Sequence, residues 1–204
     1  MIRLIDFTYE LIEAIYFVNT YSEPIKKGGN MTLIRTMAPE KADGDIKNGY
    51  DLFINKGIHV PKPFRLLSAS PGLFNLMVQR NRYYANHPKL SFTLLAHIRY
   101  FVSSKLNYDA CRIHNKNMLL KQGLDEKDFD RMHMDPGKSL LEENERKMLS
   151  FVLKAMDAPE TVSEKDMDIL HDAGWEDADI LDALAQGVGM IDHHIFMQVF
   201  KPDF

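Results

Sequence analysis

The stretch LSFTLLAHIRYFVSSKLNYDACRIHNKNMLLKQG, residues 90–123, decides the fold of this chain. Apolar residues recur in it at the three- and four-residue spacing of helices, on both sides of a short polar break. The pattern predicts two successive helices, over residues 91–106 and 109–122, with Gly123 ending the second. The only cysteine in the chain, Cys111, lies near the start of that second helix.

The rest of the chain shows the same helical periodicity and no convincing strand, so we expect an all-α helical bundle. Further helices are expected over residues 43–56, 70–87, 126–133, 141–156, 163–174 and 176–200. Ser70 followed by Pro71 is typical of a helix start, and Ser163 with Asp166 predicts a capping box. The last helix carries an apolar stripe made of Ile180, Leu184, Val188, Ile191, Ile195 and Val199.

Residues 1–40 are expected to form an N-terminal arm and linker, and residues 41–204 one helical domain. Residues 5–17 have a weak helical pattern that could dock elsewhere. Residues 19–31 contain a proline and two glycines, which is typical of a linker.

Composition narrows the class of protein. The chain has 204 residues, 45% apolar and 26% charged, with a net charge of -4. An acidic balance without a basic stripe argues against a nucleic-acid surface. No apolar run approaches the roughly 18 residues of a membrane span, and the acidic N-terminus does not resemble a signal peptide. A single cysteine excludes an internal disulfide and fits a reducing, cytoplasmic location.

The surroundings of Cys111 are those of a candidate reactive thiol. An early position in a helix favours the thiolate, because the helix dipole and free N–H groups stabilise negative charge. His114 is three residues further, on the same helical face, and Asn115 offers an amide one residue later. A thiolate beside an imidazole is a common activated nucleophile. The alternative interpretation is that Cys111 is a small buried apolar residue, as free cysteines often are.

Three stretches resemble the alkyl hydroperoxidase D-like (AhpD-like), carboxymuconolactone decarboxylase superfamily. They are LNYDACRIHN at residues 106–115, HVPKPFRLLSASPGLFNLM at residues 59–77, and the segment over residues 140–184 that contains SEKDMDILHDAGWEDADIL. The resemblance covers about residues 44–200. It implies the AhpD-like all-helical fold, small homo-oligomers and active sites near subunit contacts.

The chain departs from the pattern of the peroxidase-related members of this family. Those members carry a glutamate, a Cys-x-x-Cys pair, and a histidine four residues after the second cysteine. Placing Cys111 on the second cysteine puts Tyr108 on the first and Asn115 on the histidine. The glutamate position falls on Ala96, with His97 beside it. One thiol cannot run a dithiol cycle.

A first hypothesis keeps thiol chemistry. Cys111 would react with peroxide to give a sulfenic acid, with His114 or His97 as acid/base partner and Tyr108 as a hydrogen-bond donor. An external thiol would then be needed to reduce it. This hypothesis requires a lowered Cys111 pKa and a small-molecule substrate, a peroxide or an unknown compound.

Three other hypotheses stay open. The chain could be a redox-inactive relative that acts as a binding or structural module, or a lyase acting on a ring lactone through acid/base residues. It could also bind metal or haem through some of its eight histidines, which are His59, His87, His97, His114, His133, His171, His193 and His194. Only Cys111 and His114 have ligand spacing, so we expect no metal and no cofactor.

Overall fold

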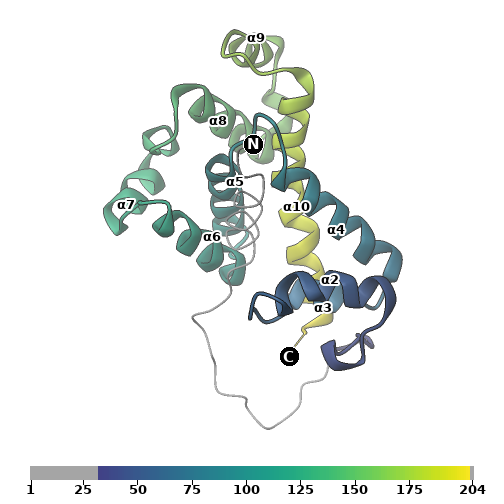
Figure 1. Cartoon of the computed structure of the whole chain (residues 1–204). Helices are drawn as coiled ribbons and strands as arrows, with labels where there is room; N and C mark the ends of the chain where they lie inside the picture. The colour runs from purple at the N-terminus through teal and green to yellow at the C-terminus, as the bar shows by residue number, and fades with distance from the viewer. Residues whose placement is uncertain (1–31, 203–204) are drawn as a thin grey trace, which may run out of the picture. The chain divides into compact units, whose positions relative to one another are not determined.

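The computed structural model describes residues 32–202, and all regular structure in that range is helical (Figure 1). The prediction of an all-α fold is confirmed. In chain order the elements are η1 (Pro39–Lys41), α2 (Gly44–Ile54), α3 (Lys62–Leu67), α4 (Pro71–Ala85), α5 (Phe92–Lys105), α6 (Asp109–Lys121), α7 (Glu126–Met134), η2 (Pro136–Lys138), α8 (Glu143–Asp157), η3 (Pro159–Thr161), α9 (Glu164–Asp172) and α10 (Asp177–Phe200).

The described residues fall into two compact units. One contains residues 32–87 and 195–202, and the other runs from Pro88 to His194. The helix and linker expected over residues 5–31 lie outside the described residues. The division into an arm over residues 1–40 and one domain over residues 41–204 stays a prediction.

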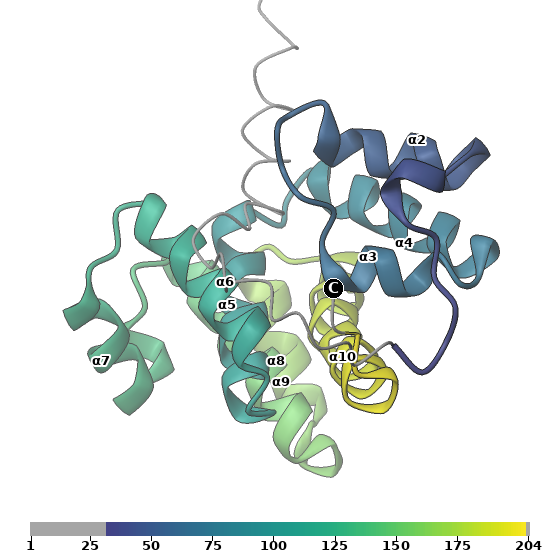
Figure 2. The ribbon, with the colours of Figure 1, turned by 90° about the horizontal axis from the view of Figure 1, so that it is seen from below.

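The first unit is built around an aromatic core between α2, α3 and α4 (Figure 2). Phe64 on α3 packs edge-to-face against Phe53 at 4.8 Å and against Phe74 at 5.8 Å between ring centroids. The helix α3 was not expected, because Pro61 and Pro63 disfavour helical backbone in the residues that precede them. It forms because Pro61 precedes the helix and Pro63 lies in its first turn, where a missing N–H costs no hydrogen bond.

The second unit is organised around α5, which packs against α6 and α8. Nine of its fourteen residues are buried, so the helix is covered on nearly every side. Ser91 caps it by accepting the Leu94 N–H at 3.0 Å. Asn107 then adopts a left-handed φ of 52°, and the Tyr108 N–H returns to the Ser103 carbonyl at 2.8 Å. This tight reversal holds the start of α6 against the end of α5.

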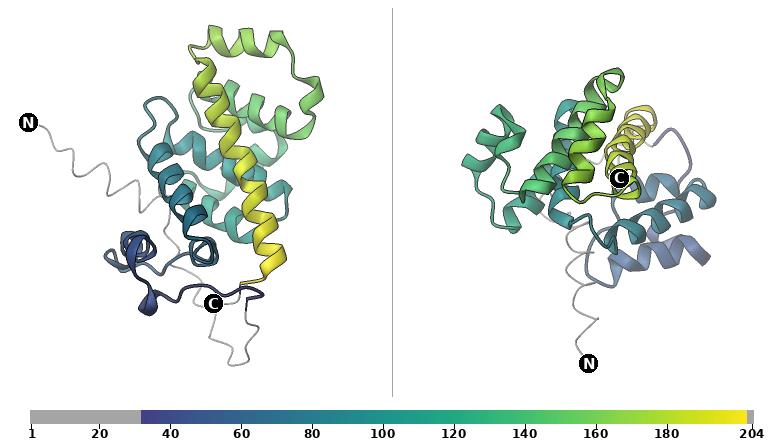
Figure 3. Two further views of the ribbon diagram at one scale, coloured as in Figure 1. Left: turned by 90° about the vertical axis from the view of Figure 1, so that its right-hand side faces the viewer. Right: turned by 90° about the horizontal axis from the view of Figure 1, so that it is seen from above.

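The N-terminus of helix α9 is held against α8 (Figure 3). The predicted capping box is confirmed, with Ser163 and Asp166 exchanging hydrogen bonds. Lys154 on α8 donates to the Asp166 carboxylate at 2.7 Å, and this bond is the main cause that lowers the Asp166 pKa to about 2. The carboxylate therefore stays ionised and keeps both helices joined at neutral pH.

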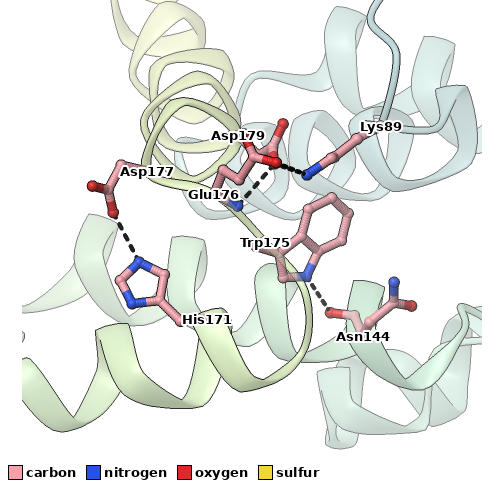
Figure 4. A network of polar contacts seen from close by, with 7 residues as sticks. All are labelled: Lys89, Asn144, His171, Trp175, Glu176, Asp177 and Asp179. Atoms are coloured by element: carbon pink, nitrogen blue, oxygen red, sulfur yellow. Dashed lines mark hydrogen bonds and ion pairs between the residues drawn. The ribbon is translucent and has the colours of Figure 1, made fainter.

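Polar contacts at the start of α10 fix that helix within the second unit (Figure 4). The Trp175 indole N–H donates to the Asn144 carbonyl on α8 at 3.0 Å. Lys89, just before α5, reaches Glu176 at 2.7 Å and the buried Asp179 at 3.1 Å. These contacts tie the first turn of α10 to both α5 and α8.

Small residues bring α10 close to α8. Ala183 and Gly187 are buried, and a Cβ on Gly187 would lie 3.1 Å from the Val152 side chain. Part of the apolar stripe identified in the sequence is instead uncovered, because Val188 is 51% exposed, and the neighbouring Leu181 is 67% exposed. The helix therefore buries a face that includes small residues and leaves other apolar side chains exposed.

Candidate functional site

The site that the sequence indicated lies at the N-terminus of α6. Tyr108 is the residue before the helix, and Cys111 lies in its first turn. The Tyr108 side chain is buried, with 6% exposed, while Cys111 is partly buried. Interaction with the Tyr108 side chain lowers the pKa of Cys111, in opposition to burial. The Tyr108 phenol lies three residues before the thiol, at the position that the resemblance assigns to the first cysteine of a Cys-x-x-Cys pair.

The Cys111 thiol is protonated in this setting. Burial raises the pKa of Cys111 from its ordinary 9.0 to about 11, and the interactions with Tyr108 and with the positive charge of Arg99 offset only part of that effect. Burial also raises the pKa of Tyr108. The surroundings of Cys111 therefore shift its pKa away from the lowered value that the thiol hypothesis requires. Removing a thiolate from water costs more free energy than its interactions with the helix N-terminus and the neighbouring groups recover.

Asn115 connects the site to α5. It is 1% exposed and accepts a hydrogen bond from the Arg99 Nε–H at 2.8 Å. Its amide donates to the Cys111 carbonyl, also at 2.8 Å. The predicted positioning role of this amide therefore has a geometric basis: it holds the backbone of Cys111 and the side chain of Arg99.

Arg99 was not identified from the sequence. It supplies the positive charge that acts on Cys111, and its guanidinium lies 5.8 Å from the ring centre of Phe92. The available signal was an arginine placed within a helix of otherwise apolar and small polar residues. A charged group in a buried helix is rare unless it is paired or functional.

His97 is completely buried on α5. Its Nδ1 lies 2.8 Å from the Thr93 carbonyl, while Nε2 has no hydrogen-bond partner among residues 32–202. Burial lowers the pKa of His97, which keeps the imidazole neutral. His114 is partly exposed on α6. The groups that shift the Cys111 pKa are Tyr108 and Arg99, and an acid/base role for either histidine stays a prediction.

A different histidine reaches the site. The ring of His194, on α10, lies 5.3 Å from the Tyr108 ring, with an interplanar angle of 54°. Its Nδ1 is buried and has no hydrogen-bond partner in the described part of the chain. Since 86 positions separate His194 from Tyr108 along the sequence, no local motif could have paired them.

Between residues 32 and 202, no three or more histidine, cysteine, aspartate or glutamate side chains are grouped so that they could hold a metal ion. Over the same range, none of the helices combines the length and the apolar character needed to cross a bilayer.

Comparison with known proteins gives the class of fold. Neither a protein-family model nor a curated protein sequence matches the chain. Two solved structures do, each with 18% sequence identity. The AhpD core of an uncharacterized peroxidase-related protein from Ralstonia eutropha JMP134 has a TM-score of 0.70, over 86% of this chain and 94% of that one. An uncharacterized peroxidase-related protein from Silicibacter sp. TM1040 has a TM-score of 0.68, over 88% and 94%.

These matches place the chain in the class of all-helical proteins with the AhpD-like fold. The AhpD-like helical bundle expected from the sequence is confirmed. At this level of identity the likeness concerns the fold, and the chemistry has to be argued from the residues of the site.

Proposed function

We propose that this chain is a member of the AhpD-like superfamily that reduces peroxides with one thiol, Cys111. The observation that carries the proposal is the arrangement at the start of α6, where Asn115 holds both the Cys111 carbonyl and the Arg99 side chain, and the buried Tyr108 directly precedes the helix. The fold shared with two peroxidase-related proteins supports it. A hydrogen-bond donor and a cation beside a sulfur can stabilise both its thiolate form and the oxygen anion that leaves the peroxide.

The reaction follows from these groups. The Cys111 thiolate attacks one oxygen of the peroxide, so that an S–O bond forms while the O–O bond breaks. The sulfur loses two electrons and becomes a sulfenic acid, and the departing oxygen takes the proton that the thiol released. Tyr108 and Arg99 stabilise the charge on that oxygen as it leaves.

The chain holds one cysteine, so its recovery needs a thiol from outside. A first external thiol attacks the sulfenic acid, releases water and forms a mixed disulfide. A second external thiol then releases Cys111 and leaves as the other half of a disulfide. A reducing cytoplasm supplies such thiols, which is the location we propose.

The raised pKa of Cys111 limits the rate of the proposed peroxide reduction. With a pKa of about 11, only about one Cys111 in 10⁴ is a thiolate at pH 7, against a few per cent for a free thiol. The proposed enzyme is therefore slow at neutral pH, and its rate rises about tenfold for each pH unit until the thiol titrates.

A second candidate is a redox-inactive relative that binds a small molecule or has a structural role. The same raised pKa favours it, because a protonated, partly buried thiol behaves as a small core residue. In that case Cys111 would react with peroxide only after the protein unfolds.

One experiment separates the two candidates. The reduced protein is exposed to hydrogen peroxide at pH 7, 8 and 9, and intact mass with a sulfenic-acid trap reports oxidation of Cys111. Peroxidase function predicts oxidation of the folded protein with a rate that rises with pH, slower in Tyr108→Phe. The Cys111→Ser variant controls for methionine oxidation. If the thiol stays reduced until denaturant is added, the redox-inactive role is the correct one.

We also propose that the protein forms a homo-oligomer through the exposed apolar face of α10. Leu181 and Val188, about two turns apart on this helix, are more than half exposed, and an apolar face of this kind often marks an interface. Light scattering at micromolar concentration should give a mass above that of one chain, and Leu181→Glu with Val188→Glu should reduce it. A monomeric wild-type protein would contradict this proposal.

A further inference from the structure

One side of α4 is apolar and yet exposed to solvent. Leu73, Leu76 and Tyr83 are 48%, 61% and 50% exposed. Their spacing of three and seven residues places them on one side of the helix, whereas Phe74 and Met77 are buried in the core of the first unit. Single apolar side chains on a surface are ordinary, but three that share one side of a helix mark a place where another segment binds.

A segment with a matching apolar side lies near the start of the chain. Residues 5–17, IDFTYELIEAIYF, precede the described part of the chain. In a helix, Ile5, Ile12 and Tyr16 would share one side, because they are seven and four residues apart. A helix with one apolar side needs a second apolar surface to cover it.

We propose that residues 5–17 bind as an amphipathic helix to the α4 face of the same chain, which is made of Leu73, Leu76 and Tyr83. The apolar side of the segment covers these three side chains. This inference is independent of the peroxide chemistry at Cys111, so either can fail without the other.

Charge complementarity selects the α4 face for this segment. Residues 5–17 contain three acids and no base. Helices α3 and α4 contain four bases and no acid, and α3 packs beside α4. One of these bases, Arg80, lies between Leu76 and Tyr83 in the sequence, at the helical spacing that puts it on the same side of α4. The exposed apolar side chains of α10 are less suited, because that helix carries four aspartates and no lysine or arginine.

The chain between the segment and the first unit is long enough for this contact. The Leu33 N–H donates to the Phe200 carbonyl at 3.2 Å, and both residues belong to the first unit, as α4 does. Residues 18–31 join the segment to this point, and 14 residues extend to at most about 46 Å. A unit of about 60 residues has a radius of gyration of about 10 Å. The α4 face therefore lies within reach of the segment in the same chain.

The test traps the bound segment with a disulfide. Ile12→Cys and Leu76→Cys are introduced into the Cys111→Ser chain, so that they provide its only two thiols. Oxidised glutathione, added at low protein concentration, should join them within one chain at least about tenfold faster than it joins Ile12→Cys to Arg82→Cys. Arg82 is the matched control, because it is also exposed on α4 but lies about 120° from Leu76 around the helix.

Two further measurements address the charges and the unmodified chain. Replacing the three acids of residues 5–17 by lysine should slow the cross-link about fivefold at low salt, and by less in about 0.5 M salt. In wild-type protein, hydrogen–deuterium exchange of residues 5–17 should be at least about tenfold slower than that of residues 18–31, and Leu76→Glu should remove this protection.

Three outcomes would overturn the inference. Equal cross-linking at Leu76 and Arg82 would show that the segment has no preferred site on α4. Unchanged exchange of residues 5–17 in Leu76→Glu would show the same without any cysteine. A disulfide that joins two chains would assign the α4 face to a second copy of the protein.

Discussion

The partly buried Cys111 thiol should affect the free energy of unfolding at alkaline pH. The pKa of Cys111 is about 11 in the folded chain, against an ordinary value of 9.0. Below pH 8 both states hold the proton, so ionisation of the thiol does not change the free energy of unfolding with pH. Above pH 9 the unfolded chain releases the proton while the folded chain keeps it, and the folded state is therefore destabilised as the pH rises.

The size of the effect follows from the two pKa values. A difference of about two units corresponds to about 2.7 kcal/mol once both states have titrated. At pH 10 the linkage relation gives a loss of about 1.4 kcal/mol relative to pH 8. Urea unfolding followed by circular dichroism at pH 8, 9 and 10, under reducing conditions, measures this loss.

Other groups titrate in the same range, so the comparison must be with Cys111→Ala. Lysines and tyrosines contribute equally to both proteins, and the difference between their unfolding free energies isolates the thiol. That difference should shrink by about 1.4 kcal/mol from pH 8 to pH 10 as the advantage of the wild-type side chain is lost. A difference that stays constant would show that the thiol ionises equally in both states, and the argument from burial would be refuted.

Two further predictions concern side chains away from the thiol. Gly49→Ala should destabilise the first unit by about 1–3 kcal/mol, because the new methyl group would meet the buried Phe74 ring. Gly72→Ala, which meets nothing within 4 Å, is the control and should be neutral or stabilising in thermal melts. Because the pKa of His97 is lowered, the unfolded chain takes up a proton below about pH 6.5 while the folded chain does not. The free energy of unfolding should therefore decrease as the pH is lowered, by up to about 1.4 kcal/mol per pH unit. His97→Asn should show less of this acid dependence in urea titrations, and an equal dependence would contradict the burial argument.

The helices were predictable because their signals are local. The periodicity over residues 91–122, the glycine at 123 and the serine at 163 each act within one or two turns, and α5, α6 and α9 form accordingly. The helix α3 was not predicted, because a proline disfavours helical backbone in the residue before it, although prolines are tolerated in a first turn.

Only part of the site could be predicted from the sequence, because its composition depends on which helices pack together. Tyr108 and Cys111 are three residues apart, so their proximity could be expected. The contributions of Arg99 and His194 require that α5 and α10 pack beside α6, which no local spacing records. The direction of the Cys111 pKa shift could not be read from the sequence for the same reason, since burial is a property of the folded chain.

The phenol at position 108 limits the chemistry that this site can support. A phenol cannot form a disulfide with the Cys111 sulfur, and the chain holds no second cysteine, so an oxidised Cys111 has no disulfide partner within the chain. If Cys111 is oxidised as proposed, its sulfenic acid persists until an external thiol arrives, and its partly buried position limits its access to further peroxide. Under the proposed function, such a site is oxidised slowly, and its sulfenic acid is protected from further oxidation. Slow, base-dependent oxidation followed by complete recovery with an added thiol is the behaviour that this arrangement of Tyr108 and Cys111 predicts.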